Sequence, residues 1–391
     1  MKKVLFLPLF TMNSGHHQTA EALMDSFSKN NPEIICEKVD FLSYFSKPFE
    51  QFISKYYMKG ITRFPSFYSS FYQKFFNKSS ALLHYTYEVL FLEKMETLLS
   101  QKQPDLIVCT HSFTSLLVSK LKEYGVCHAP VINCYTDFFI NGLWGSKGTD
   151  WHFVPNKDVK ERLIAEGVPS GQVIVTGILT HDAIKSKKRI KKKSDKLHIL
   201  VAGGSQGLGE NFSLLEQVEE SHSALYRVLC GSNHRLFQQL SELNSEAIIP
   251  LSYISSPQSM NELYEWADAI ITKPGGVTTS EALKKNLPIF IHSVLPGQEE
   301  MNLAYLELKG VIHRLESTEP LEEQLFARLN NEAMEFRMRK NRFDYLNEIE
   351  VESNEELFHF IHENIMNPPS QHDEMIDSIL SKIYASLDAN V

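Results

Sequence analysis

The sequence alternates short apolar runs with segments of helical period, and it does so twice along its 391 residues. This alternation is typical of parallel strands, because a crossover helix must carry the chain from the end of one strand to the start of the next. In the first half the predicted strands are Val4–Phe10, Leu106–Thr110, Val131–Tyr135, Trp151–Val154 and Val173–Thr176. In the second half they are Leu197–Ala202, Leu225–Cys230, Ala247–Leu251, Ala269–Thr272 and Pro288–His292. The sequence therefore predicts two α/β domains, with any ligand between them at the carboxyl ends of the strands.

A lysine-rich run divides the two halves and sets the predicted boundaries. Its basic residues at 185–193 have almost no apolar residue between them, which is typical of a solvated linker; a phosphate or membrane patch is the alternative. The tail carries one apolar stripe at helical spacing and is expected to pack on the N-terminal domain, with membrane contact as the alternative. The predicted units are an N-terminal domain at 1–185, a linker at 186–195, a C-terminal domain at 196–365 and an amphipathic helix at 366–391.

Composition excludes several classes of protein. Hydrophobic residues make up 43% of the chain and charged residues 22%, so each half can bury a core. The five cysteines are scattered without a C-x-x-C pair, which disfavours a disulfide framework or a structural zinc site. A net charge of −9 disfavours a general nucleic-acid coat. The opening MKKVLFLPLF has a short apolar run with Pro8 inside it and no cleavage site behind it, so we interpret it as a buried strand of a cytoplasmic protein.

Two glycine loops follow predicted strands of the second half. Free N–H groups at such a strand-to-helix turn can bind an anion, although a tight turn without a ligand has the same pattern. A dinucleotide is disfavoured, because no carboxylate ends the strand after the first loop. The first loop holds Gly203, Gly204, Ser205 and Gln206, and the second holds Gly275, Gly276, Thr278 and Thr279.

Polar side chains beyond the second loop suit the remaining parts of a sugar nucleotide. Glu281 lies about one and a half turns into the predicted helix, where it can accept from a ribose diol; favouring the first turns of that helix is the alternative. Gln298, Glu299 and Asn302 follow the next strand and suit sugar hydroxyls, unless the loop is merely solvated. The second loop therefore predicts a diphosphate site.

These motifs resemble one known family. K-P-G-G at 273–276 and P-G-Q-E at 296–299 are similar to the donor site of the monogalactosyldiacylglycerol synthase and processive diacylglycerol glucosyltransferase family, within glycosyltransferase family 28. S-G-H at 14–16, T-D-F at 136–138 and T-G-I at 176–178 resemble its N-terminal motifs. The resemblance implies a GT-B fold of two Rossmann-like domains with parallel sheets facing a central cleft. It also implies a UDP-sugar donor, inversion, a lipid acceptor, and uracil near Tyr253 and Ile254. The chain departs from the family pattern in having fewer glycines before Gly15, no proline after the T-G-I motif and a second histidine, His17.

An inverting transfer needs a base for the acceptor hydroxyl and a counter-charge for the departing diphosphate. His16 is the predicted base; Asp137 would orient it or be the base itself, and His17 stays a third candidate. No D-x-D occurs in the sequence, so we expect no metal cofactor, and the N–H groups of the glycine loops would stabilise the leaving group.

The segment 41–78 differs from the rest of the chain. It holds 14 of the 43 aromatic residues and six cations against one carboxylate. Interleaved aromatic and basic residues suit an anionic membrane surface, with a core helix pair as the alternative; single-stranded nucleic acid is disfavoured because no nucleic-acid module accompanies it. The residues expected to contact membrane and acceptor are Phe67, Phe71, Lys74, Phe75, Phe76 and Lys78.

Together these features predict an enzyme that moves a hexose from UDP-glucose or UDP-galactose to a lipid hydroxyl, diacylglycerol first among the candidates. It would work as a peripheral protein on the inner face of the cell membrane. The alternatives are N-acetylglucosamine transfer to a polyprenyl-linked precursor, a UDP-sugar epimerase, and a non-catalytic UDP-sugar-binding regulator.

Overall fold

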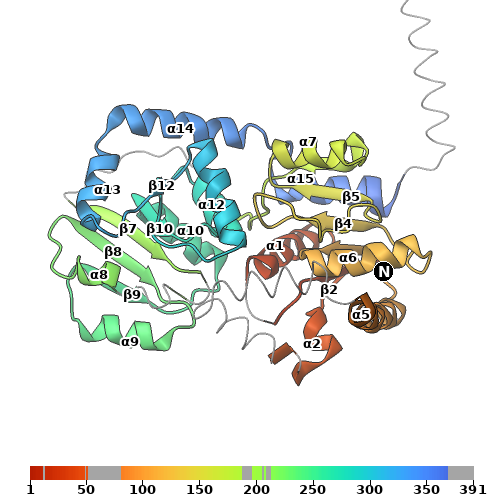
Figure 1. The fold of residues 1–391 in the computed structure, drawn as a ribbon. Coiled ribbons are helices and arrows are strands. Elements are labelled where there is room, and N and C mark those ends of the chain that lie inside the picture. The colour runs from red at the N-terminus through yellow and green to blue at the C-terminus, as the bar shows by residue number, and fades with distance from the viewer. Residues whose placement is uncertain are drawn as a thin grey trace, which may run out of the picture.

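A computed structural model of the chain describes residues 1–11, 14–48, 50–51, 81–186, 196–204, 207 and 213–368. Within these ranges the chain forms two parallel sheets of six strands, each covered by helices (Figure 1). The strand orders are β2-β1-β3-β4-β5-β6 and β12-β11-β10-β7-β8-β9. The predicted α/β class with two parallel sheets is therefore confirmed.

The strands of the first sheet, and the helices that connect them, lie within residues 3–175. Its strands are β1 (Lys3–Leu7), β2 (Ile35–Lys38), β3 (Leu106–Cys109), β4 (Val131–Cys134), β5 (Trp151–Val154) and β6 (Val173–Val175). Its helices are α1 (Gly15–Asn30), α2 (Phe41–Phe45), α5 (Ala81–Lys102), α6 (Ser112–Glu123) and α7 (Lys157–Ala165). All four residues of β3 and of β4 are buried, as expected for strands covered on both faces.

The second sheet repeats this plan. Its strands are β7 (Leu197–Ala202), β8 (Ala224–Leu229), β9 (Ile248–Leu251), β10 (Ala269–Thr272), β11 (Ile289–Ile291) and β12 (His313–Arg314). The helices that follow β7 are α8 (Ser213–Glu216), α9 (His234–Glu242), α10 (Pro257–Trp266), α11 (Gly276–Lys284), α12 (Gln298–Lys309), α13 (Leu321–Leu329), α14 (Glu332–Leu346) and α15 (Asn354–Ile361).

The ten predicted strands are confirmed with small changes at their ends. The first strand was expected to reach Phe10, but β1 ends at Leu7, immediately before Pro8, which has no N–H to give to the ladder. Two strands were missed, β2 and β12. Residues 187–195, which are most of the predicted linker, lie outside the described residues, as does the predicted tail beyond 368.

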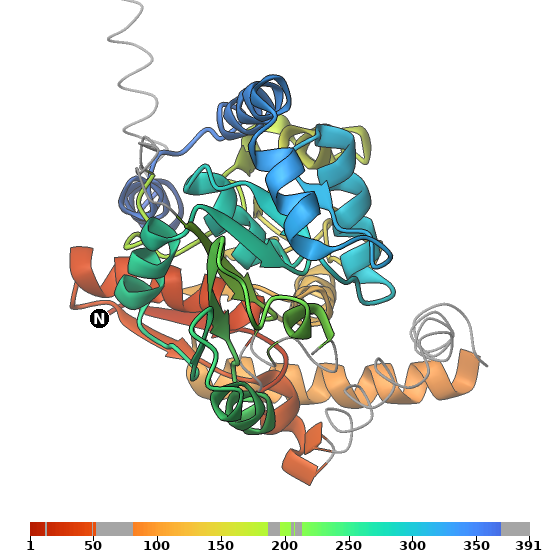
Figure 2. The same ribbon diagram turned by 90° about the vertical axis from the view of Figure 1, so that its left-hand side faces the viewer.

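The last described α-helix, α15, packs on the first sheet and not on the second. It packs beside α1 in both views (Figures 1 and 2), where Phe358 meets Phe27 edge-to-face with ring centroids 5.1 Å apart. Leu357, Phe358 and Ile361 are buried in the same core as residues of β1. The sequence prediction assigned 196–365 to the C-terminal domain. The structure shows that the chain returns to the first domain earlier, at about residue 350, because the apolar face of α15 packs on α1.

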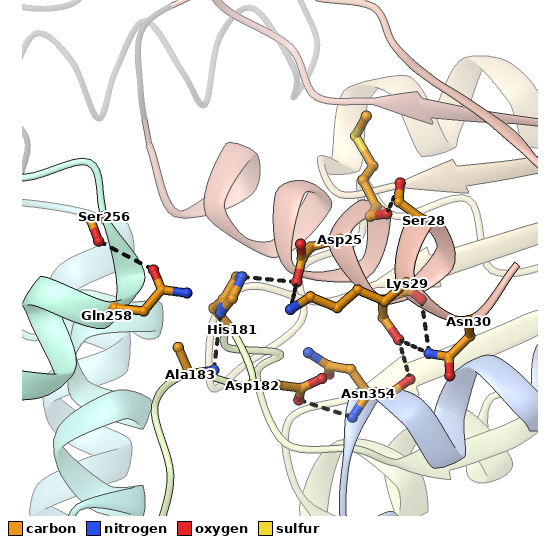
Figure 3. Close-up of polar contacts among 12 residues, drawn as sticks. Asp25, Ser28, Lys29, Asn30, His181, Asp182, Ala183, Ser256, Gln258 and Asn354 are labelled. Carbon is orange, nitrogen blue, oxygen red and sulfur yellow. Dashed lines mark hydrogen bonds and ion pairs between the residues drawn. The ribbon is translucent and has the colours of Figure 1, made fainter. Parts of the chain in front are cut away.

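The chain passes from the first domain to the second after about residue 180 and returns at about residue 350. Hydrogen bonds at the start of α15 join these two crossings. The Asn354 side chain donates to the carbonyl of Thr180 at 2.9 Å, and the Ser26 hydroxyl donates to the carbonyl of Asn354 at 2.9 Å. Figure 3 shows the same region, with His181 beside Asp25 of α1 at 3.1 Å. A hollow of about 410 Å³ lies between the crossings and α11.

Within the described residues, no helix is both long and apolar enough to cross a membrane.

The packing of α15 gives a stability test. Phe358 is 3% exposed, so Phe358→Ala should lower the free energy of unfolding by about 3–5 kcal/mol, because it leaves a cavity against Phe27. Phe336→Ala is the matched control: Phe336 on α14 is 71% exposed, and its loss should cost less than about 0.5 kcal/mol. Thermal or urea unfolding measures both. Equal effects of the two substitutions would contradict the docking of α15.

Candidate functional site

The second glycine loop begins α11, and its tight packing explains one of the two glycines. Gly275 is the N-cap and Gly276 the first helical residue. A Cβ on Gly276 would lie 1.9 Å from the carbonyl oxygen of Thr136, in the loop after β4, so only glycine allows this approach. The first N–H groups of a helix have no acceptor within the helix. Here they lie at the boundary between the two domains. The loop thus joins the two domains as well as offering donors to an anion.

Glu281 is held by a tyrosine from the neighbouring helix. The Tyr264 hydroxyl donates to Glu281 Oε2 at 2.7 Å. Burial raises the pKa of Glu281 to about 7, and the hydrogen bond from Tyr264 partly opposes that rise. The sequence analysis did not identify Tyr264 as a partner. Contact of Glu281 with a ribose stays a prediction.

Other predicted donor residues lie at the carboxyl ends of β7 and β9. Gly203 and Gly204 follow β7, and Gly204 has the positive φ of +75° that glycine adopts freely. Ser205 and Gln206 lie outside the described residues. Tyr253 and Ile254 follow β9; Tyr253 is 44% exposed, whereas Ile254 packs against the core of the second sheet. The uracil contact at these two residues stays a prediction.

His16, the second residue of α1, reaches the first domain's strand ends. Its Nδ1 lies 2.7 Å from the carbonyl oxygen of Thr110 and 2.9 Å from the hydroxyl of Thr136. A carbonyl only accepts, so Nδ1 carries the proton and Nε2 keeps its lone pair. Burial lowers the pKa of His16 to about 4, so the ring is neutral at neutral pH. Within the described part of the chain, Nε2 makes no hydrogen bond.

His111 is a neighbour that the sequence analysis missed. It caps α6, where its Nδ1 accepts from the N–H of Phe113, and its ring centroid lies 4.7 Å from that of His16. Burial and the nearby His16 hold the pKa of His111 well below its usual value. The cap requires a neutral ring, so His111 adds a fixed, uncharged wall to the site.

His17 faces away from this group. Its Nε2 lies 2.8 Å from Asp40 Oδ1, its Nδ1 lies 3.2 Å from the hydroxyl of Ser14, and the residue is 3% exposed. Both ring nitrogens are therefore occupied, as in a structural histidine.

Asp137, after β4, makes a contact across the domain boundary. Its Oδ1 accepts from the Asn302 side chain at 2.8 Å, and the Asn302 Oδ1 accepts from the N–H of Phe138 at 2.9 Å. Burial raises the pKa of Asp137 to about 6; Asn302 opposes this rise, and the charge of Glu299 adds to it. The Asn302 amide is thus bound to the other domain, and its contact with a sugar stays a prediction.

Gln298 and Glu299 begin α12 beside this contact. Glu299 Oε2 accepts from the N–H of Leu295 at 2.7 Å, and burial raises the pKa of Glu299 while the charge of Lys273 lowers it. The structure thus brings Asp137, Glu299 and Lys273 to one edge, next to the start of α11. No group of three His, Cys, Asp or Glu residues that could hold a metal ion occurs among the described residues. The six membrane and acceptor residues predicted in 67–78 lie outside them.

Both halves of the chain match models of glycosyltransferase families. Residues 16–179 match monogalactosyldiacylglycerol (MGDG) synthase, and residues 198–349 match the glycosyltransferase family 28 C-terminal domain. An uncharacterized glycosyltransferase, YkoN, of Bacillus subtilis (strain 168) is 38% identical over 318 residues, which cover 80% of this chain and 84% of that protein. A processive diacylglycerol beta-glucosyltransferase of Bacillus cereus (strain G9842) is 32% identical over 326 residues, covering 79% of this chain and 80% of that protein.

Solved structures share the fold. MurG of Acinetobacter baumannii superposes with a TM-score of 0.58 at 13% identity, covering 93% of this chain and 99% of that one. The UDP co-structure of MnaA from S. aureus gives a TM-score of 0.53 at 15% identity, covering 88% and 92%. The predicted GT-B arrangement is thereby confirmed.

The approach of Gly276 to Thr136 gives a matched pair of substitutions. Gly276→Ala should cost about 1–3 kcal/mol or force the domains apart, because its Cβ has no room. Gly275→Ala meets nothing within 4 Å and should cost less than about 1 kcal/mol, as a weaker N-cap. Melting temperature and the radius of gyration from X-ray scattering measure the two effects. Wild-type values for Gly276→Ala would show that the domains do not meet there.

Proposed function

The chain belongs to glycosyltransferase family 28, and we propose that it transfers a hexose from a UDP-sugar to the free hydroxyl of diacylglycerol with inversion. One observation carries this proposal: His16 of the first domain, whose Nε2 makes no hydrogen bond within the described residues, lies beside the glycine-started helix α11 of the second. Thr136 contacts both: its carbonyl oxygen packs against Gly276, and its hydroxyl lies within hydrogen-bond distance of His16 Nδ1. The proposed base and the proposed diphosphate site therefore lie on either side of Thr136. The diacylglycerol acceptor is supported by the relative from Bacillus cereus.

On the donor side, the N–H groups at the start of α11 bind the diphosphate, and Glu281 accepts from the ribose hydroxyls. The hydrogen bond from Tyr264 occupies Oε2 and favours the ionised carboxylate, which is the form that can accept two hydroxyls. Lys273 adds a positive charge beside Glu299, at the end of β10. The donors proposed are UDP-glucose and UDP-galactose, which differ at one hydroxyl.

On the acceptor side, His16 is the general base. Its Nδ1–H is held by the carbonyl of Thr110, so the lone pair is on Nε2, where it can accept the proton of an acceptor hydroxyl. Asp137, which follows the Thr136 that contacts His16, is proposed to assist this base. His17 is a weaker candidate because both of its nitrogens have partners.

The leaving diphosphate needs positive counter-charge, and we propose that fixed N–H groups and the dipole of α11 supply it without a metal ion. The sequence holds no D-x-D carboxylate pair to position one. We also propose that the aromatic and basic segment 41–78 holds the enzyme on an anionic membrane surface as a peripheral protein, because each cation adds about 1 kcal/mol near such a surface.

The reaction is tested with radiolabelled UDP-glucose, UDP-galactose and UDP-N-acetylglucosamine and vesicles of anionic lipid that contain both diacylglycerol and a polyprenyl-linked acceptor. We expect labelled hexosyl-diacylglycerol from one of the two UDP-hexoses, and undiminished yield in excess EDTA. Label that appears only on a polyprenyl acceptor, or isomerised UDP-sugar without a lipid product, would overturn the acceptor proposed. Loss of activity in EDTA that Mg²⁺ restores would overturn the metal-free route.

The role of His16 is tested separately. His16→Ala should lower kcat by about 10²–10⁴-fold, the usual contribution of a general base, while calorimetric UDP affinity stays near wild type. His128→Ala, at an exposed histidine of the same domain, is the control and should leave both unchanged. If Asp137→Asn abolishes turnover and His16→Ala lowers it less than about tenfold, Asp137 is the base instead.

A further inference from the structure

The side chain of Asn302 joins the two domains at the proposed catalytic carboxylate. Its Nδ2 donates to Asp137 Oδ1 at 2.8 Å and its Oδ1 accepts from the Phe138 N–H at 2.9 Å. Asn302 is 1% exposed, so both bonds are shielded from water. It projects from α12, the helix that lies on the side of the second domain facing the first (Figure 1).

We propose that Asn302 is a positioning residue: its amide clasps Asp137 and Phe138 across the domain boundary and couples the seating of the sugar nucleotide on α12 to the placement of the Asp137 carboxylate. This inference rests on the proposed function, which makes Asp137 part of the catalytic group. It assigns Asn302 no contact with the reacting atoms.

The two partners require an amide at this position. The Phe138 N–H needs an acceptor and the Asp137 carboxylate needs a donor, and an asparagine side chain presents one of each on a short, rigid fork. An aspartate would place two carboxylates together, and a leucine would leave both groups buried without a partner. A glutamine carries the same groups but is one methylene longer.

The position of Asn302 on α12 makes the clasp responsive to the donor. Gln298 and Glu299, the proposed sugar contacts, are the first residues of the same helix, one turn before Asn302. A shift of α12 that follows donor binding therefore moves the amide against Asp137. The ionisable group that acts on Asp137 is Glu299, whose charge raises the Asp137 pKa.

The clasp favours the ionised form of Asp137, so its removal should be visible in the pH dependence of catalysis. Asp137 has a pKa of about 6, and the Asn302 hydrogen bond is what opposes a larger rise. Asn302→Leu should therefore move the acid limb of kcat/KM to higher pH by about one unit, and lower kcat at least tenfold at pH 7. The KM for the UDP-hexose should change less than about threefold if the amide acts on Asp137 and not on the sugar.

Exchanging the side chains at 302 and 137 distinguishes a positioning role of Asn302 in catalysis from a role in stability alone. Asn302→Asp should lower the melting temperature, because it sets two buried carboxylates against each other. Adding Asp137→Asn to it restores one donor and one acceptor, so the melting temperature should return while kcat stays low, because no carboxylate stands at 137. Asn302→Gln should recover part of the activity lost in Asn302→Leu. Asn330→Asp, at an exposed asparagine of the same domain, should leave all readouts near wild type.

Three results would overturn the proposal. A raised KM with an unmoved acid limb would make Asn302 a sugar contact. A loss of kcat that tracks melting temperature across all variants would make it a structural residue only. Unchanged stability in Asn302→Asp would show that the clasp does not form. If the wild-type enzyme transfers no hexose to lipid, the proposed function fails; the melting temperatures of the exchanged pair still report whether the clasp exists.

Discussion

The contact on which this site depends is the approach of the first turn of α11 to the loop after β4. Three consecutive residues of that loop carry it: Thr136 meets Gly276 and His16, and Asp137 and Phe138 share the amide of Asn302. The Phe138 ring also stacks on Tyr305 of α12, with centroids 5.5 Å apart. This short loop of the first domain therefore touches two helices of the second domain, α11 and α12. This loop therefore connects the group proposed as base with the residues proposed to bind the donor.

The strands were predictable because a parallel strand covered on both faces is a continuous apolar run. The two missed strands lack that signature for different reasons. β2 reads Ile-Cys-Glu-Lys with exposed and partly buried residues in turn, as an edge strand does, and β12 has two residues that pair only with β11. The start of α11 was predictable from its glycines. The contacts of Asn302 were not predictable, because its partners lie 164 and 165 residues away and a local motif does not indicate such distant partners.

The two adjacent histidines show where sequence reasoning about a site ends. Successive residues of a helix point about 100° apart, so only one of His16 and His17 can face a given edge. Both are histidines at the start of α1, and local propensity treats them alike. Their partners separate them: His17 is held by Asp40 and Ser14, whereas His16, among the residues that the structure describes, bonds only through Nδ1. The loop and strand residues that make these bonds decide which ring keeps a free nitrogen.

The return of α15 to the first domain constrains how the two domains can move. The chain crosses between them twice, and Asn354 ties the second crossing to Thr180 of the first, while Ser26 of α1 ties it to the core. The core around Phe27 is completed by Phe358 and its neighbours, so the domain that carries His16 is not finished by residues before the linker. Any motion of the second domain against the first therefore acts on these hydrogen bonds as well as on the one between Asn302 and Asp137.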